Sequence, residues 1–87
     1  MDFEFDPNKS LSNKIKHGID FDEAQLLWSD ELLVSIVARE GEELRYMSIG
    51  RIDRRFWSAV YAMRGERIRL ISVRRSRRQE IDFYENQ

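Results

Sequence analysis

Apolar residues in the first third of the chain recur at the spacing of a helix. Leu11 and Ile15 lie four residues apart and form a narrow apolar stripe, in a segment that starts at Asp6-Pro7 and stops at Gly18. Aspartate is a frequent N-cap, proline fits the first helical position, and glycine readily adopts the left-handed conformation that ends a helix. The pattern predicts a helix that ends at about His17.

A second helix is predicted directly after this turn. Asp20 and Glu23 have the spacing of a capping box, in which each side chain bonds the backbone of the other residue. The apolar face of this helix consists of Phe21, Ala24, Leu27 and Trp28. Because only a tight glycine turn separates the two helices, we expect them to form a hairpin that covers a sheet.

From Leu32 onwards, the apolar positions follow the two-residue period of β-strands. The pattern predicts four strands, at Leu32 to Val37, Leu44 to Ile49, Phe56 to Met63 and Arg67 to Val73. The connections between them are too short for the crossovers of a parallel sheet, so we expect antiparallel pairing. Ser76 then predicts the N-cap of a final helix, with Gln79 three residues later completing a capping box.

These elements predict a single α+β domain over residues 1–87. An N-terminal helical hairpin is expected to pack on a four-stranded antiparallel β-sheet with a C-terminal helix, and all helices are expected on one face. Phe3 and Phe5 point the same way in an extended segment and are expected to anchor the N-terminus on the core. Trp28 and Trp57 are assigned to the core rather than to base stacking. The core is predicted to contain Leu11, Ile15, Phe21, Ala24, Leu27, Trp28, Val60, Ile68 and Leu70.

Composition narrows the possible chemistry. The chain has no Cys and one His, which excludes disulfide frameworks, Cys-based zinc sites, iron–sulfur clusters, cysteine nucleophiles and zinc sites built from several His. It also lacks a Gly-rich phosphate loop and a Gly-x-Ser-x-Gly motif, and we expect no cofactor. No segment has the ~18 apolar residues of a membrane span, and the acidic N-terminus is unlike a secretory signal. A cytoplasmic protein is therefore expected.

The small net charge of −1 conceals a strong polarity along the chain. Residues 1–44 contain eleven Asp or Glu against four Lys or Arg, whereas residues 45–87 contain eleven Arg against five acids. Two interpretations are open. Either the arginines form a basic surface for a polyanion or an acidic partner, or the two halves neutralise each other within the fold.

Six arginines fall within twelve residues, on the fourth predicted strand and directly after it. Alternation along the strand places Arg67 and Arg69 on one face, about 7 Å apart. Guanidinium groups bind phosphate in bidentate geometry, and a helix N-terminus adds N–H donors. This favours a phosphate-binding surface over an arginine-rich face paired only with acids of the first half. The other four arginines lie where the strand passes into the final helix, at Arg74, Arg75, Arg77 and Arg78.

Four other side chains are candidates for proton transfer, each with a structural alternative. His17 is the only histidine, the side chain that most often exchanges protons near neutral pH, but at a helix end it could simply cap free carbonyl groups. Lys16 could be an ordinary exposed lysine. Glu80 and Tyr84 lie one turn apart on the final helix, where Tyr84 would equally suit the apolar face.

Two blocks of sequence resemble the BrnT family of toxins. Lys-His-Gly-x-x-Phe-x-Glu-Ala begins at Lys16, and Arg-Ile-Arg-x-Ile-Ser-x-Arg-Arg begins at Arg67. The resemblance covers nearly the whole chain, although Phe5 replaces a usual Trp and Ser76 replaces a frequent Ala. Further matching positions are Phe5-Asp6, Lys9, Asn13, Arg45, Ile49-Gly50, Glu80 and Tyr84.

The resemblance implies the toxin of a type II toxin–antitoxin module, with a RelE-like fold, that cleaves RNA and so inhibits translation and growth. It also implies neutralisation by a BrnA-like antitoxin with a ribbon-helix-helix DNA-binding part. Operator DNA would then be contacted only through the antitoxin complex. The alternative is a non-catalytic RNA- or DNA-binding or regulatory module that uses the same arginine-rich face. A structural partner of an acidic protein is the third possibility.

Metal-independent RNA cleavage needs fixed cations at the phosphate and groups that move protons to and from the reacting oxygens. With a single His the usual pair of imidazoles is impossible, so other side chains must share the work. The residues expected to act in catalysis are Lys16, His17, Arg67, Arg69, Glu80 and Tyr84. Those expected to bind RNA phosphates are Arg45, Arg74, Arg75, Arg77 and Arg78.

Within this set, the reacting phosphate is expected to be held by Arg67, Arg69 and Arg74. The proton-transfer groups are expected to be Lys16 and His17, which the predicted helical hairpin carries. Glu80 or Tyr84 is the competing choice for that role.

Overall fold

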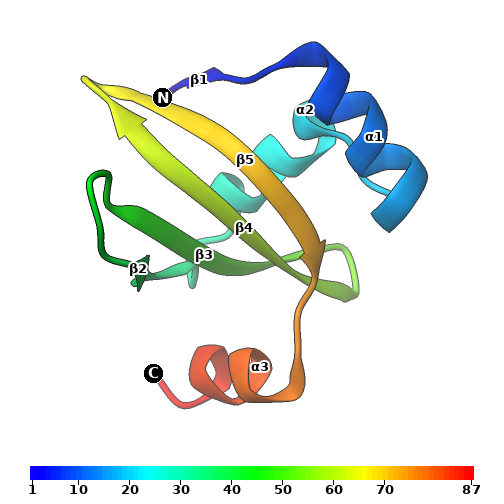
Figure 1. Cartoon of the computed structure of the whole chain (residues 1–87). Helices are drawn as coiled ribbons and strands as arrows, with labels where there is room; N and C mark the ends of the chain where they lie inside the picture. The colour runs from blue at the N-terminus through cyan, green and yellow to red at the C-terminus, as the bar shows by residue number, and fades with distance from the viewer.

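A twisted five-stranded sheet forms the centre of the computed structural model, which describes residues 1–87 (Figure 1). The strands are β1 (Asp2–Glu4), β2 (Val34–Arg39), β3 (Arg45–Ile52), β4 (Arg55–Arg64) and β5 (Arg67–Arg75). Their order across the sheet is β1-β5-β4-β3-β2, with β1 parallel to β5 and all other neighbours antiparallel. The predicted α+β class is confirmed. The predicted four-stranded antiparallel sheet is wrong, because the N-terminal segment adds a parallel fifth strand.

Strand β1 is held by aromatic contacts as well as by its pairing with β5. The ring of Phe3 meets Trp28 edge-on with 5.0 Å between centroids, and Phe5 meets Phe21 at 5.6 Å. The expected anchoring of the N-terminus on the core is therefore confirmed. Three residues are too few to show a two-residue period, which is why the apolar pattern did not predict this strand.

The helical segments are α1 (Pro7–His17), α2 (Phe21–Ala24), the 3-10 helix η1 (Gln25–Ser29) and α3 (Arg78–Glu85). Helix α1 has the predicted ends, since the Asp6 side chain accepts a hydrogen bond from the Asn8 N–H (2.8 Å) and Gly18 has a φ of 84°. The predicted hairpin of two helices is wrong, because α2 has one turn and continues as η1. Phe21, Ala24 and Leu27 are spaced by three and fully buried, and a 3-10 helix keeps residues at that spacing on one face.

Helices lie on both faces of the sheet, and not on one face as predicted (Figure 1). Trp57 and Ala59 of β4 belong to the core cluster that contains residues of α2 and η1, whereas Ser58 between them bonds Glu80 of α3. Because neighbouring side chains on a strand point to opposite faces, α3 lies on the face opposite to α2. Polar contacts of α3, which the apolar pattern does not record, hold it there.

The core confirms most of the predicted apolar positions and corrects two of them in α1. Leu11 and Ile15 are 63% and 80% exposed. The inward side of α1 carries Ser10 and Asn13, so the predicted apolar stripe faces outward. Trp57 is buried as expected, while Trp28 and Val60 are only partly buried. The correctly predicted core residues are Phe21, Ala24, Leu27, Ile68 and Leu70.

Hydrogen bonds replace apolar packing beneath α1. The Asn13 amide donates to the backbone oxygens of Ile19 and Val73, both at 2.8 Å, and its side-chain oxygen accepts from the Val73 N–H at 3.2 Å. Strand β1 pairs only with residues 67–69 of β5. At Val73, further along β5, the Asn13 side chain takes the place of a neighbouring strand. The Ser10 hydroxyl accepts from the Phe21 N–H (2.9 Å). Buried backbone groups must be paired, and this need decides which side of α1 faces the sheet.

We expect Asn13→Ala to lower the free energy of unfolding by about 2–4 kcal/mol, because it leaves buried backbone groups of Ile19 and Val73 without partners. Chemical denaturation followed by circular dichroism measures the change. Ile15→Ala, on the exposed side of α1, is the control, with an expected change within about 0.5 kcal/mol. A larger loss for Ile15→Ala than for Asn13→Ala would contradict this orientation of the helix.

Candidate functional site

Only two ion pairs join the acidic first half of the chain to the basic second half. They link Arg64 to Glu43 (3.2 Å) and Arg69 to Glu4 (2.9 Å). The other ion pairs lie within one half and are Lys14–Glu23, Arg74–Glu80 and Arg78–Asp82. Mutual neutralisation therefore leaves most arginines without a carboxylate partner. These are Arg39, Arg45, Arg51, Arg54, Arg55, Arg67, Arg75 and Arg77.

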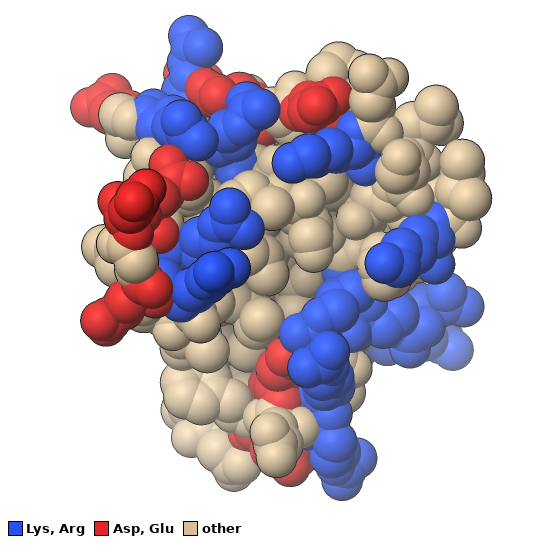
Figure 2. All heavy atoms as spheres, in the orientation of Figure 1, with Lys and Arg blue, Asp and Glu red and all other residues tan.

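Basic side chains gather at one end of β5. In Figure 2, a band of Lys and Arg starts beside the end of β5 and follows the connection to α3. Around the β4–β5 hairpin, at the opposite end, basic and acidic side chains are mixed. The segment under the basic band contains Arg74, Arg75, Arg77 and Arg78, and we call these four residues the basic cluster.

Arg74 is fixed in the basic cluster by a bidentate ion pair with Glu80. Its Nη1 and Nη2 donate to the two carboxylate oxygens at 2.8 and 2.7 Å. Glu80 Oε1 accepts two more hydrogen bonds, from the Ser58 hydroxyl (2.8 Å) and the Arg77 backbone N–H (2.9 Å). The side chains of Arg74 and Glu80 are only 20% and 15% exposed. One carboxylate thus joins β4, β5 and α3, and we call this arrangement the Glu80 clamp.

Glu80 is ionised at neutral pH. Partial burial alone would raise its pKa, but hydrogen bonds from Arg74, the Arg77 backbone and Ser58 outweigh burial and lower the pKa to about 2. The hydrogen bond to Glu80 also raises the pKa of Arg74. A carboxylate with so low a pKa is a weak proton acceptor and has no proton to donate at neutral pH. The geometry therefore suits Glu80 to positioning Arg74 better than to proton transfer.

The start of α3 differs from the predicted one. The Ser76 hydroxyl lies 2.8 Å from the Ser58 hydroxyl and does not cap the helix. Arg77 is the N-cap, and Glu80 is the third helical residue that reaches back to it. The predicted capping box of Ser76 and Gln79 is wrong by one residue, because Glu80 has the additional charged partner that fixes it at this position.

Tyr84 lies one turn beyond Glu80 and has a different partner. Its hydroxyl donates to Asp30 Oδ2 (2.8 Å), which also accepts from the Arg51 backbone N–H (2.8 Å). Burial, and then the bond to Asp30, raise the pKa of Tyr84. Tyr84 thus fastens α3 to β3 and to the segment before β2. Sequence reasoning did not single out Asp30, whose only signal is an aspartate at a helix–strand boundary, where such residues bond backbone N–H groups.

Three predicted arginines lie away from the basic cluster. Arg67 begins β5 and Arg74 follows seven residues later, so their Cα atoms are roughly 23 Å apart at about 3.3 Å per residue. Arg69, two residues further along β5, lies nearer to Arg74 and pairs with Glu4 of β1. Arg45 starts β3 at about the level of Arg69. The structure does not bring Arg67, Arg69 and Arg74 together around one phosphate.

Lys16 and His17 end α1 at the same end of the sheet as the basic cluster. Asn13 fixes α1 beside Val73, and the helix runs on from there towards the end of β5 (Figure 1). His17 lies one turn beyond Asn13 on the inward side and is half-buried, while Lys16 is exposed. These two predicted residues are therefore grouped with the basic cluster.

We expect Glu80→Gln to lower the free energy of unfolding at pH 7 by on the order of 3 kcal/mol. The pKa of Glu80 falls from 4.5 to about 2 on folding, and each pKa unit corresponds to about 1.4 kcal/mol. Because the folded-state pKa is the lower one, this stabilisation is complete above pH 4.5 and is lost as the pH falls towards 2.

Urea denaturation of both proteins from pH 7 down to pH 2.5 tests this dependence. The stability difference between wild type and Glu80→Gln should shrink below pH 4.5. Asp82→Asn is the matched control, because Asp82 forms a long, exposed pair with Arg78 (3.4 Å) worth at most about 1 kcal/mol. A difference for Glu80→Gln that is the same at every pH would contradict the role of the clamp.

Two further findings concern the whole chain. No group of three or more His, Asp or Glu side chains is arranged so that it could hold a metal ion. None of the helices is long and apolar enough to cross a membrane.

Comparison with known proteins assigns the chain to a family. Residues 5–80 match a family model described as a ribonuclease toxin, BrnT, of a type II toxin–antitoxin system. A search of curated proteins found no match. The matched segment contains Lys16, His17, the basic cluster and Glu80, and leaves out Tyr84. Since the match spans most of the chain, this protein belongs to the BrnT family of ribonuclease toxins of type II toxin–antitoxin systems.

Proposed function

We propose that this protein is a metal-independent endoribonuclease that acts in the cytoplasm, cleaves RNA and thereby inhibits translation and growth. Its family supplies the reaction class and an RNA substrate. The observation that carries the proposal is the basic cluster, in which Glu80 fixes Arg74 at the end of the sheet where α1 also ends. The antiparallel order of β2 to β5 beside α1 supports a RelE-like fold as part of this proposal.

RNA cleavage without a metal ion uses the 2′-hydroxyl as the nucleophile. The 2′-oxygen bonds to the adjacent phosphorus while the bond from phosphorus to the 5′-oxygen breaks, which gives a 2′,3′-cyclic phosphate and a 5′-hydroxyl. A base takes the proton of the 2′-hydroxyl, and an acid protonates the leaving 5′-oxygen. Extra negative charge on the phosphoryl oxygens needs fixed donors and cations.

The basic cluster supplies those donors and cations. Of the five N–H groups of Arg74, two bond Glu80 and one bonds the Arg75 carbonyl (3.2 Å), so the Nε–H and one Nη2–H are available to a phosphate. The Glu80 clamp fixes the direction of these donors but cancels the charge of Arg74. The net positive charge therefore comes from Arg75 and Arg77, which have no carboxylate partner.

Proton transfer is assigned to His17 and Lys16. Glu80 is committed to Arg74, and its pKa of about 2 makes it a poor base. The Tyr84 hydroxyl donates to Asp30, and its raised pKa makes it a weaker acid than usual. His17 and Lys16 are the remaining predicted groups that could exchange protons beside the basic cluster.

Arg69 is assigned to a different phosphate from Arg74. The β4 partners of these arginines, Ala62 and Ser58, are four residues apart, so Arg69 and Arg74 share a face of the sheet. Their separation along β5 is about 16 Å, which suits neighbouring nucleotides of one strand better than a single phosphate. RNA would thus follow this face of β5 towards the basic cluster. Arg67 would contact it only beyond Arg69, outside the cleaved nucleotides.

We expect Arg74→Ala and His17→Ala to cleave RNA about 100- to 1,000-fold more slowly than the wild type, since loss of one stabilising donor or proton-transfer group has this effect. Arg74→Lys, which keeps a charge opposite Glu80, should also be slow because it loses the planar fork. Cleavage of a labelled RNA in EDTA measures the rates, and far-UV circular dichroism checks the fold.

Arg67→Ala is the matched control, because it removes the same charge at the far end of β5 and should slow cleavage less than about tenfold. Wild-type rates for both Arg74→Ala and His17→Ala would refute this placement of the site. Loss of wild-type cleavage in EDTA would refute metal independence. Salt-sensitive RNA binding without any cleavage would favour a non-catalytic binding module.

An antitoxin is proposed to cover the basic cluster. A type II toxin has an antitoxin partner. We propose that this partner is BrnA-like, with a ribbon-helix-helix part, so that operator DNA is bound through the complex and not by the toxin alone. Unpaired arginines favour acidic or aromatic residues of a partner, and their burial is stable only where each finds a partner group.

Co-expression with the protein encoded next to its gene should yield one complex in size-exclusion chromatography. We expect the complex to cleave RNA at least about 100-fold more slowly than the free toxin, because the antitoxin would cover the donors that stabilise the reacting phosphate. Separate elution of the two chains would contradict the proposed partner.

A further inference from the structure

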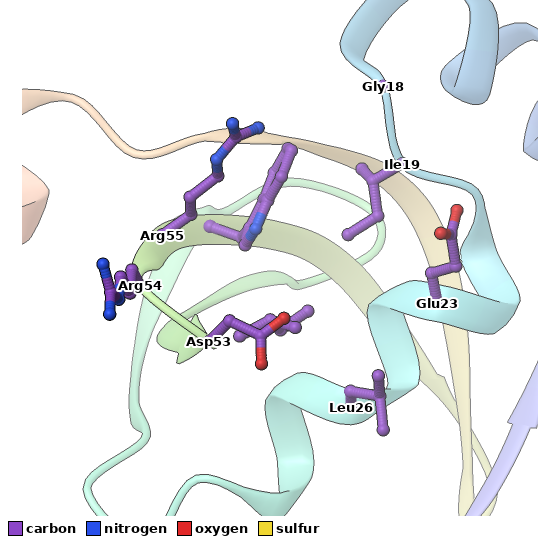
Figure 3. Close-up of a pocket in the computed structure, with 9 residues that line it drawn as sticks. Gly18, Ile19, Glu23, Leu26, Asp53, Arg54 and Arg55 are labelled. Atoms are coloured by element: carbon purple, nitrogen blue, oxygen red, sulfur yellow. The ribbon is translucent and has the colours of Figure 1, made fainter.

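A pocket of about 630 Å³ lies between the start of α2 and the turn that joins β3 to β4 (Figure 3). Its apolar walls are formed by Ile19, Leu26, Ile52 and Trp57. The volume falls within the roughly 300–1,000 Å³ of typical small-ligand sites. None of the residues assigned to cleavage lines it, so it is a separate site.

The pocket adjoins the residues proposed for cleavage at two points. Gly18, which lines it, directly follows His17 in the chain. Trp57, another lining residue, pairs in register with Arg75, whose guanidinium lies 5.6 Å from the centre of the Trp57 ring. Arg75 thus shares a face of the sheet with Trp57, on the opposite side from Arg74. RNA that passes from Arg74 around the end of β5 to Arg75 would place a neighbouring nucleotide at this pocket.

Asp53 contributes a free carboxylate. It lies in the two-residue turn between Ile52 and Arg55, which pair with each other, and it is the only non-glycine residue with a positive φ, at 56°. Aspartate tolerates this conformation, but glycine would adopt it without strain. The Asp53 carboxylate points towards the interior of the pocket in Figure 3 and takes part in no ion pair of the structure.

Two arginines without a carboxylate partner also line the pocket. They are Arg54 and Arg55, and both are exposed. The other acid of the pocket, Glu23, is already occupied by Lys14 at 2.7 Å. The pocket thus combines apolar walls, one free acceptor and two free guanidinium groups. A nucleotide has the matching parts, which are a flat base with N–H donors on its edge and a phosphate.

We propose that this pocket binds a nucleobase of the RNA next to the cleaved nucleotide, and that it prefers guanine. The inference rests on the proposed function, whose substrate it specifies. Guanine carries its N1–H and its exocyclic amino group side by side, so one carboxylate, that of Asp53, accepts from both. Uracil has a single N–H between two carbonyl oxygens, and these would face the carboxylate. Arg54 and Arg55 bind the phosphate of the same nucleotide.

Binding of GMP and of UMP to the full-length protein tests the proposal independently of cleavage. NMR titration follows the backbone amide signals of Gly18, Asp53 and Arg54. The two nucleotides carry the same phosphate, so the difference between them isolates the base. We expect GMP to bind roughly 5- to 150-fold more tightly than UMP, the range for one good bidentate base contact.

Three variants distinguish the effect of the Asp53 carboxylate on binding from the effect of the turn conformation. Asp53→Asn should reduce GMP binding to the level of UMP. Asp53→Gly should do the same while relieving the backbone strain, so that loss of folding cannot explain the result. Glu66→Gln, which removes the same charge in the turn between β4 and β5, is the matched control and should keep the preference for GMP.

Equal binding of GMP and UMP to the wild type would overturn the base site and leave the ribonuclease proposal intact. Signal changes confined to the residues around Arg74 would do the same. A preference for GMP in a protein that does not cleave RNA would refute the proposed ribonuclease activity and support the base site. Pocket signals that respond to the antitoxin but to neither nucleotide would assign the pocket to the protein partner and overturn the inference.

Discussion

The ion pair between Arg74 and Glu80 is the contact on which the candidate site depends. One carboxylate receives donors from β4, from β5 and from the start of α3, three segments that fold together around it. Mostly buried charges are stable only when they are paired and hydrogen-bonded, so loss of either partner leaves an uncompensated charge. The need to pair the Glu80 charge therefore fixes both the position of α3 and the direction of the Arg74 guanidinium.

The pair also divides the arginines of the basic cluster into two kinds. Arg74 is oriented and its charge is compensated by Glu80, and Arg78 is paired with Asp82, whereas Arg75 and Arg77 carry uncompensated charge. Uncompensated positive charge attracts a polyanion from a distance, and the range of this attraction decreases as the salt concentration rises. Oriented donors act only at contact, where they fix the register of a bound phosphate. A surface that must first capture RNA and then hold one phosphate in place needs both kinds side by side.

The basic cluster could be predicted from the sequence because its arginines are neighbours in the chain and stay neighbours where a strand ends. Contacts between residues that are far apart in the sequence could not be predicted in this way. Arg69 is paired through Glu4, which lies on a strand too short to show a period. Apolar spacing placed Leu11 inward, whereas the inward side of α1 is set by Asn13 and the backbone groups it satisfies. The sequence indicates Glu80 only as an alternative proton-transfer group, and the spacing of residues on α3 does not reveal its ion pair with Arg74.

The bonds that Asn13 makes to Val73 complete an edge of the sheet with a side chain. Exposed strand edges are where foreign strands add, in domain swapping and in aggregation. On the β5 side, the short β1 and the amide of Asn13 occupy that edge, so β2 is the only long strand with one side open. A strand contributed by another chain would have to join at β2, across the width of the sheet from Arg74. Growth of the sheet by strand addition would thus leave the basic cluster uncovered.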